Sequence, residues 1–151
     1  MKQNFIFIIT LLTILSIVNA FPRQFYKRDT IFNPCTTGSS DTITVTITPD
    51  PLVAGELNVF NVNGTLTNGT IDTDSELLIQ LQDDAGEVIG DPFTFDICAP
   101  APANVTCPAT TFSLQEEIQV DTLPEEYNIQ VQINDANGNT LACATSSVPS
   151  A

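Results

Sequence analysis

Short segments in which apolar and polar residues strictly alternate are the feature that most limits how this chain can fold. The clearest segments are Thr42–Thr48 and Tyr127–Ile133, in which every second residue is Ile, Val or Tyr. This spacing places the apolar side chains on one face of an extended strand. No segment of useful length has the 3.6-residue period of an amphipathic helix. The sequence therefore predicts an all-β protein.

Turn residues divide the chain into seven or eight such segments. Proline and glycine turns stand at 49–51, 90–92 and 137–138. Further strands are expected at 57–66, 76–82, 87–97, 111–120 and 140–145. Within 57–66, Leu57 and Val59 alternate out of phase with Phe60, which predicts a bulge or a strand covered on both faces. Short strands at even spacing favour an antiparallel sandwich over a barrel.

The first 28 residues have the features of a secretory leader. Lys2 precedes an apolar run from 5 to 18, and small residues precede position 21, so residues 1–20 are expected to be a signal peptide. The run is shorter than the roughly 20 residues that cross a bilayer. Residues 21–28 end in Lys27-Arg28 and are expected to be a pro-segment, the alternative being an uncut basic tail. One domain, 29–151, would then be secreted or would reside in the lumen of the secretory or vacuolar pathway.

Charge is divided sharply along the chain. All 4 Lys and Arg residues lie in the first 28 positions, whereas all 18 Asp and Glu residues lie from Asp29 onward. A nucleic-acid partner is excluded, because its phosphates need cationic side chains, and docking on anionic lipid is disfavoured. The chain has no His and no Trp, so proton-transfer and zinc chemistry lack their usual residues. We therefore expect no enzyme activity and no cofactor. We also expect a monomer.

Four cysteines in a secreted chain indicate two disulfides, for which three pairings exist. Cys98 and Cys107 bracket the proline-rich loop 99–106, so a local bridge between them is one of the three. It would leave Cys35 and Cys143 to join the two ends of the domain.

Three sequons fit passage through the secretory route, with asparagines at Asn63, Asn68 and Asn104. Two acidic segments, 72–76 and 135–139, resemble calcium-binding loops in composition. Ordinary turn chemistry explains the same residues. We therefore expect no metal site.

A series of landmarks runs along the mature chain. They are Cys35, Pro49-Asp50-Pro51 with Gly55 following, Gly64, Phe95-Asp96-Ile97-Cys98, Cys107-Pro108, Leu123-Pro124 before Tyr127, and Cys143. Taken together, they resemble the ML lipid-recognition domain family, in particular fungal phosphatidylglycerol/phosphatidylinositol transfer proteins and, more distantly, secreted Niemann-Pick sterol carriers. The resemblance spans Cys35 to Cys143.

This resemblance implies an immunoglobulin-like sandwich of two antiparallel sheets, pairing of Cys35 with Cys143 and of Cys98 with Cys107, and a lipid held between the sheets. It implies a carrier of single sterols or phospholipids that makes transient contact with membranes. Since the mature domain has no Lys or Arg to pair with an anionic headgroup, a neutral lipid such as a sterol fits its charge better. The residues expected to line the cavity are Val45, Ile47, Val59, Phe93, Phe95, Phe112, Tyr127, Ile129 and Val131, with Phe95 and Phe112 as gates.

Two alternatives remain open at the level of the sequence. The same residues would form the core of a solid sandwich, as in an immunoglobulin-like adhesion or wall-binding module without bound lipid. A secreted factor that acts on a host receptor or protease is the third reading.

Overall fold

The computed structural model describes residues 29–36, 41–98 and 105–149, and these contain eight strands and no helix. The expected signal peptide, pro-segment and sequon at Asn104 lie outside the described residues. The strands are β1 (Asn33–Pro34), β2 (Ile43–Thr48), β3 (Leu57–Thr65), β4 (Glu76–Gln82), β5 (Phe93–Asp96), β6 (Thr111–Gln119), β7 (Tyr127–Asn134) and β8 (Thr140–Val148).

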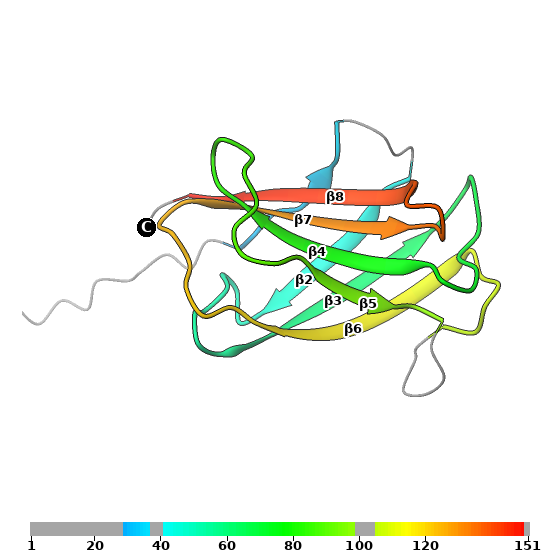
Figure 1. The fold of residues 1–151 in the computed structure, drawn as a ribbon, viewed down its shortest axis with the longest axis horizontal. Coiled ribbons are helices and arrows are strands. Elements are labelled where there is room, and N and C mark those ends of the chain that lie inside the picture. The colour runs from blue at the N-terminus through cyan, green and yellow to red at the C-terminus, as the bar shows by residue number, and fades with distance from the viewer. Residues whose placement is uncertain (1–28, 37–40, 99–104, 150–151) are drawn as a thin grey trace, which may run out of the picture.

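Two antiparallel sheets pack face to face (Figure 1). One sheet has five strands in the order β1-β8-β7-β4-β5, and the other has three strands in the order β2-β3-β6. The predicted sandwich is therefore confirmed. Within the described ranges, no helix is long and apolar enough to span a membrane.

The alternating residues fill the space between the sheets, as their spacing predicted. In β2, Ile43, Val45 and Ile47 are buried while the intervening threonines are exposed. In β4 and β7 buried residues alternate with half-buried ones, and the register places Ile79 beside Val131 on the inner face. Two apolar faces thus meet in one core, and their burial supplies the main stabilisation.

The prediction of a bulge or a doubly covered strand at 57–66 is wrong. Strand β3 pairs with β2 and β6 without a register shift. Its inner row is Asn58, Phe60 and Val62, while Leu57 is 60% exposed and Val59 lies on the outer face. Asn58 keeps this row in phase because its side-chain amide bonds the backbone of the preceding turn, accepting from Val53 N (2.9 Å).

Other strand limits differ for local reasons. The expected strand 87–97 is reduced to β5, because Gly90, with φ of +72°, and Pro92 interrupt it. Strand β8 runs to Val148 instead of 145, and β7 is irregular between Ile133 and Asn134. Strand β1 has only two residues, too few for any periodic signal.

Gly64 allows close packing near the end of β3. A Cβ on this residue would lie 2.7 Å from Cζ of Phe112, its register partner on β6, and 3.0 Å from Cγ2 of Ile43. The first distance is too short for a real Cβ and the second is tight, so the phenyl ring rests directly on the glycine backbone. This contact explains why Phe112 is only 4% exposed.

Candidate functional site

The two long sides of the sandwich are joined differently. On the side formed by segment 29–36, β2 and β8, which we call the linked side, β1 pairs with β8 and Cys35 forms a disulfide with Cys143. Alternation in β8 places Ala142 and Ala144 inward, so Cys143 faces outward and is covered by the N-terminal segment. Cys143 N also donates to the carbonyl of Asp41 (3.4 Å), which joins the approach to β2 to the other sheet.

Asp41 adds a side-chain link on the same side. Its carboxylate accepts hydrogen bonds from Thr67 Oγ1 (2.5 Å), Thr67 N (2.8 Å) and Asn68 N (3.2 Å). The Thr67 hydroxyl, followed by these backbone amides, holds the pKa of Asp41 below its usual value against the effect of burial. At the other end of this side, Thr30 N donates to Asp50 Oδ2 (2.9 Å) and the Thr30 hydroxyl to Oδ1. The linked side therefore has hydrogen bonds at both of its ends, through Asp41 at one end and Asp50 at the other.

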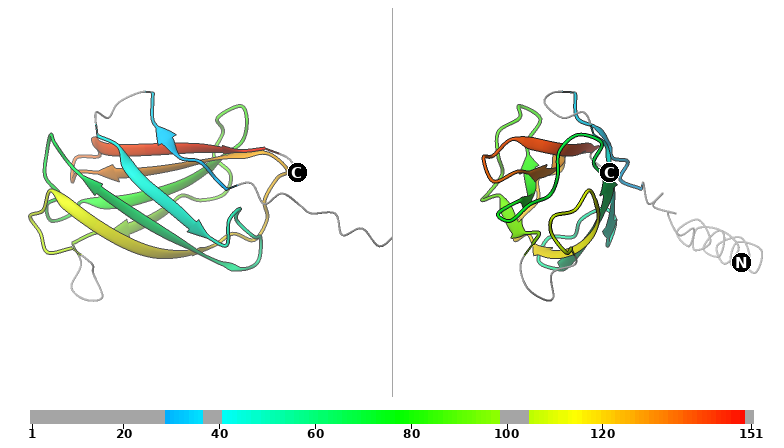
Figure 2. Two further views of the ribbon diagram at one scale, coloured as in Figure 1. Left: turned by 180° about the vertical axis from the view of Figure 1, so that it is seen from behind. Right: turned by 90° about the vertical axis from the view of Figure 1, so that its right-hand side faces the viewer.

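The opposite side, formed by β5 and β6, is the unlinked side (Figures 1 and 2). Among the described residues no backbone hydrogen bond joins β5 to β6. A covalent link lies beyond the end of β5, where Cys98 forms a disulfide with Cys107. Both disulfides are thus the pairs that the resemblance implied. Along most of its length the unlinked side depends on side-chain packing alone.

The predicted lining residues fall into three groups. Six are buried between the sheets, and two, Phe93 and Phe95, are half-buried on the edge strand β5, facing inward beside Ile79 and Leu77. Val59 lies on the outer face and does not point between the sheets. The six buried residues are Val45, Ile47, Phe112, Tyr127, Ile129 and Val131.

The middle of the core is closed. Ile129 and Val131 are 0% exposed, as are Phe60 and Leu77, so no space large enough for a water molecule borders them. The structure does show an open cavity of about 270 Å³ at the β4–β5 edge. Of the predicted lining residues, Phe95 lines it, together with Asp74, Ser75, Glu76, Thr94 and Asp96.

Besides Asn58, three polar side chains lie on the apolar inner faces, and sequence reasoning singled out only Tyr127 among them. Glu116 of β6 shares the inward parity of Leu114 and Ile118, and burial raises its pKa. Its carboxylate forms no hydrogen bond with another described residue. Strict alternation along 111–119 could have identified it, since Glu116 occupies an inward position.

Tyr127 and Ser146 are the other two. Both are more than nine-tenths buried, and neither Tyr127 Oη nor Ser146 Oγ has a hydrogen-bond partner among the described residues. Burial, together with the charge of Asp50, raises the pKa of Tyr127 to about 12. The backbone amide of Leu52 opposes that rise from near Tyr127 Oη, but its geometry is not that of a hydrogen bond. No periodicity marks Ser146 as special, because a buried serine usually has a partner.

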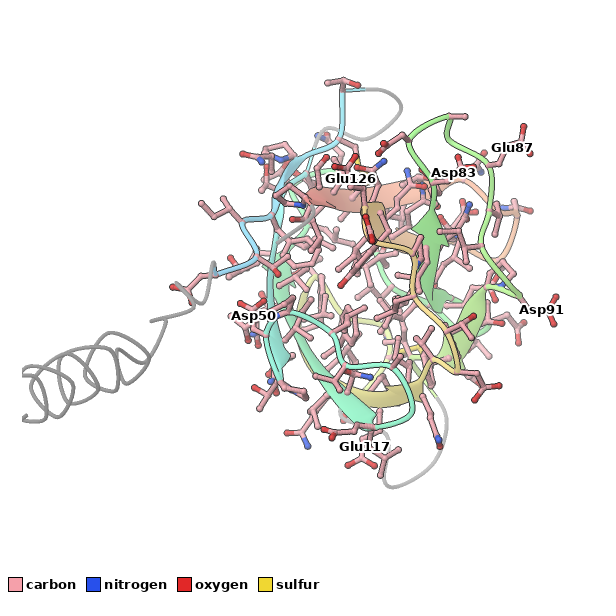
Figure 3. The ribbon with its side chains drawn as sticks, turned by 90° about the vertical axis from the view of Figure 1, so that its left-hand side faces the viewer. Asp50, Asp83, Glu87, Asp91, Glu117 and Glu126 are labelled. Carbon is pink, nitrogen blue, oxygen red and sulfur yellow. A yellow bond between two sulfur atoms is a disulfide. The ribbon has the colours of Figure 1, made fainter. Side chains whose placement is uncertain are left out.

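The end of the sandwich beside Tyr127 carries many carboxylates. Figure 3 looks onto this end, and the labelled side chains Asp50, Asp83, Glu87, Asp91, Glu117 and Glu126 lie around its periphery. A hydrogen bond with Glu126, then burial and the charges of Glu126 and Asp83, raise the pKa of Asp84. We call this region, formed by the loops 49–56, 83–92 and 120–126, the acidic end.

The remaining candidate positions lie on the surface. Asn63 and Asn68 are exposed, as a glycan would require. Asp135 accepts hydrogen bonds from Asn137 N (2.8 Å) and from Asn139 N (2.8 Å) and Nδ2 (2.9 Å), so its oxygens serve a turn. Across the described ranges there is no group of three or more His, Cys, Asp or Glu side chains arranged to hold a metal ion.

Comparison with known proteins identifies the family. A Niemann-Pick type C2 protein from the Japanese carpenter ant shares the fold at low identity (TM-score 0.54, 14% identity, 78% of this chain and 96% of that chain). Chicken MD-1 complexed with lipid IVa is a weaker structural match (TM-score 0.48, 15% identity, 79% of this chain and 87% of that chain). No curated protein matches the sequence. Residues 29–150 match the model of the ML domain, and the chain therefore belongs to the ML domain family.

Proposed function

We propose that this protein binds single neutral lipids, with the hydrocarbon between its two sheets, and carries them between membranes outside the cell or in the lumen of the secretory pathway. The observation that carries the proposal is the unlinked side, where inward-facing Phe93 and Phe95 are half-exposed on an edge strand. Membership of the ML domain family supports the same reading.

Lipid uptake by this route requires the sheets to separate between β5 and β6. Separation exposes apolar inner faces, and the hydrocarbon of the lipid then covers them. Burial of hydrocarbon is favourable by about 0.8 kcal/mol per methylene, or roughly 12 kcal/mol for a 16-carbon chain. A bilayer offers the same chain nearly the same gain, so exchange is close to balanced, as a carrier requires.

Membrane contact is proposed at the acidic end. Val53, Leu57 and Val88, exposed by 37%, 60% and 46%, belong to or border its loops. Such side chains insert into a neutral lipid surface, whereas the surrounding carboxylates repel an anionic one. Transfer to phosphatidylcholine vesicles should therefore exceed transfer to phosphatidylglycerol vesicles at neutral pH, and acidification should narrow the difference.

A matched pair of variants on β5 tests the proposal. Phe95 points inward and Thr94 points outward and is exposed, so Phe95→Asp places a charge at the expected opening while Thr94→Asp places one on the surface. We expect Phe95→Asp to reduce transfer of fluorescent sterol between phosphatidylcholine vesicles at least tenfold, with Thr94→Asp close to wild type. Equal transfer by two folded variants, checked by circular dichroism, would contradict uptake at this side.

A second candidate function has one observation in its favour. The closed middle of the core fits an immunoglobulin-like interaction module that binds no lipid. Mass spectrometry of organic extracts of the purified protein separates the two functions. Co-purified lipid at near one molecule per chain supports the carrier, whereas repeated lipid-free extracts, with no uptake from vesicles, support the module.

A further inference from the structure

Two buried hydroxyl groups on the inner face of the five-stranded sheet lack partners. Ser146 is 2% exposed and Tyr127 is 4% exposed, and no hydrogen bond to Ser146 Oγ or Tyr127 Oη is formed within the described residues. A buried polar group without a partner is costly, and most such groups in folded proteins are satisfied. By contrast Asn58, also fully buried, donates to Val53 O (3.1 Å) and Glu56 O (2.9 Å).

The register places these two residues together. Tyr127 pairs with Val148 and Ser146 pairs with Ile129, so the two side chains are diagonal neighbours on adjacent strands and the same face. Ser146 continues an inward row of small side chains in β8, after Ala142 and Ala144. If the two sheets move apart, the space between them is deepest beside these small side chains. The hydroxyl groups of Ser146 and Tyr127 border this space.

The surroundings define what these hydroxyls can bind. Asp50 lies close enough to Tyr127 to raise its pKa, and the sequence from Asp29 onward contains no Lys, Arg or His. A carboxylate or phosphate buried here would lack a counter-ion and would face the negative charge of Asp50. A plain hydrocarbon would leave both hydroxyls unsatisfied. A hydroxyl group both donates and accepts, so it can pair with Ser146 or Tyr127 without adding charge.

We propose that Ser146 and Tyr127 form the polar subsite of the cavity and bind the hydroxyl group of a neutral lipid, so that this protein prefers hydroxylated lipids to hydrocarbons of the same shape. The inference rests on the proposed function, since the lipid reaches the subsite only when the sheets separate. It adds the chemical class of the ligand and the side chains that recognise it.

The test uses two pairs of probes that differ in one hydroxyl group: 5α-cholestan-3β-ol with 5α-cholestane, and hexadecanol with hexadecane. Uptake of each from phosphatidylcholine vesicles is measured for the full mature protein and for Ser146→Ala and Tyr127→Phe, which remove only the hydroxyl oxygen. Ser147→Ala is the matched control, because Ser147 is the next residue, is exposed, and bonds Asn128 Oδ1 (2.6 Å) outside the core.

We expect wild type and Ser147→Ala to prefer the hydroxylated member of at least one pair about tenfold, as one buried hydrogen bond would give. Ser146→Ala or Tyr127→Phe should abolish that preference without lowering the Tm of the lipid-free protein. Equal uptake of both members by wild type, or an unchanged preference in both variants, would overturn the subsite while the carrier stands. A lower lipid-free Tm in both variants would indicate buried water as the partner and would also overturn it. No uptake of any probe would overturn the carrier itself.

Discussion

The linked and unlinked sides of the sandwich contain similar strands but are held in different ways. On the linked side, segment 29–36 contacts both sheets: its Thr30 bonds Asp50 at the end of β2, and β1 pairs with β8. On the unlinked side, β5 and β6 share no backbone hydrogen bond within the described chain, and Phe93 and Phe95 of β5 pack against the core. The linked side therefore resists separation through a disulfide and hydrogen bonds, whereas the unlinked side has the Cys98–Cys107 disulfide at one end and depends on apolar contact elsewhere.

This difference shows how a closed core can belong to a binding protein. Apolar contacts between two edge strands can be replaced by contacts with a lipid at little cost, because both are non-directional. The backbone hydrogen bonds of the linked side cannot be replaced in this way. Motion is thus expected at the unlinked side, with the linked side acting as the fixed edge.

The largest expected effect comes from removing each disulfide. In the loop-entropy description, Cys35–Cys143, which spans 108 residues, stabilises by roughly 4.8 kcal/mol, and Cys98–Cys107, which spans 9, by roughly 2.7 kcal/mol. The double variant Cys35→Ser/Cys143→Ser should therefore lose more stability than Cys98→Ser/Cys107→Ser in urea unfolding. If the two double variants lost equal free energy of unfolding, the disulfides would not account for a difference between the two sides.

An intermediate effect is expected in amide hydrogen exchange. Amides of β5 should exchange at least tenfold faster than those of β8, because β5 is a short edge strand, whereas β8 pairs with β7 along its length and with β1 at Ala144 and Thr145. Addition of a bound lipid should slow exchange in β5 and β6 and leave β8 unchanged. Slower exchange in β8 alone would place uptake on the linked side.

The smallest effects concern two carboxylates with opposite pKa shifts. Asp41 has a lowered pKa, so its contribution to stability is fully present above its ordinary value of 3.8 and is lost as the pH falls through the folded value. Glu116 has a raised pKa, so its cost is present above the folded value and disappears below its ordinary value of 4.5.

At pH 7, Asp41→Asn should therefore lower the Tm and Glu116→Gln should raise it slightly. The gain from Glu116→Gln should not exceed about 0.5 kcal/mol, because this side chain is partly exposed and its charge is screened. Both differences should shrink in thermal melts near pH 3. A destabilised Glu116→Gln variant at pH 7 would show that the carboxylate has a partner.

Periodicity predicted most of the fold and part of the candidate site. It identified the inward rows of β2, β4 and β7 because these strands are long and strictly alternating. It failed for Val59, where Leu57 is apolar but exposed at the start of β3 and so shifted the apparent phase. The deciding residue was Asn58, whose burial depends on hydrogen bonds to a turn that no periodicity reveals.

Two further features could not be predicted from the sequence, for a related reason. They are the unpaired hydroxyl groups and the difference between the linked and unlinked sides. Whether Ser146 has a partner depends on neighbours that are distant in sequence. Whether β5 pairs with β6 depends on the strand order of the two sheets, which alternation along one strand does not report.

The contact between Gly64 and the ring of Phe112 has a consequence for how this domain can change during evolution. Because the ring occupies the place that a Cβ would need, a larger residue at position 64 requires a smaller one at position 112. Among homologous chains, these two positions should therefore vary together, with the sum of their side-chain volumes nearly constant.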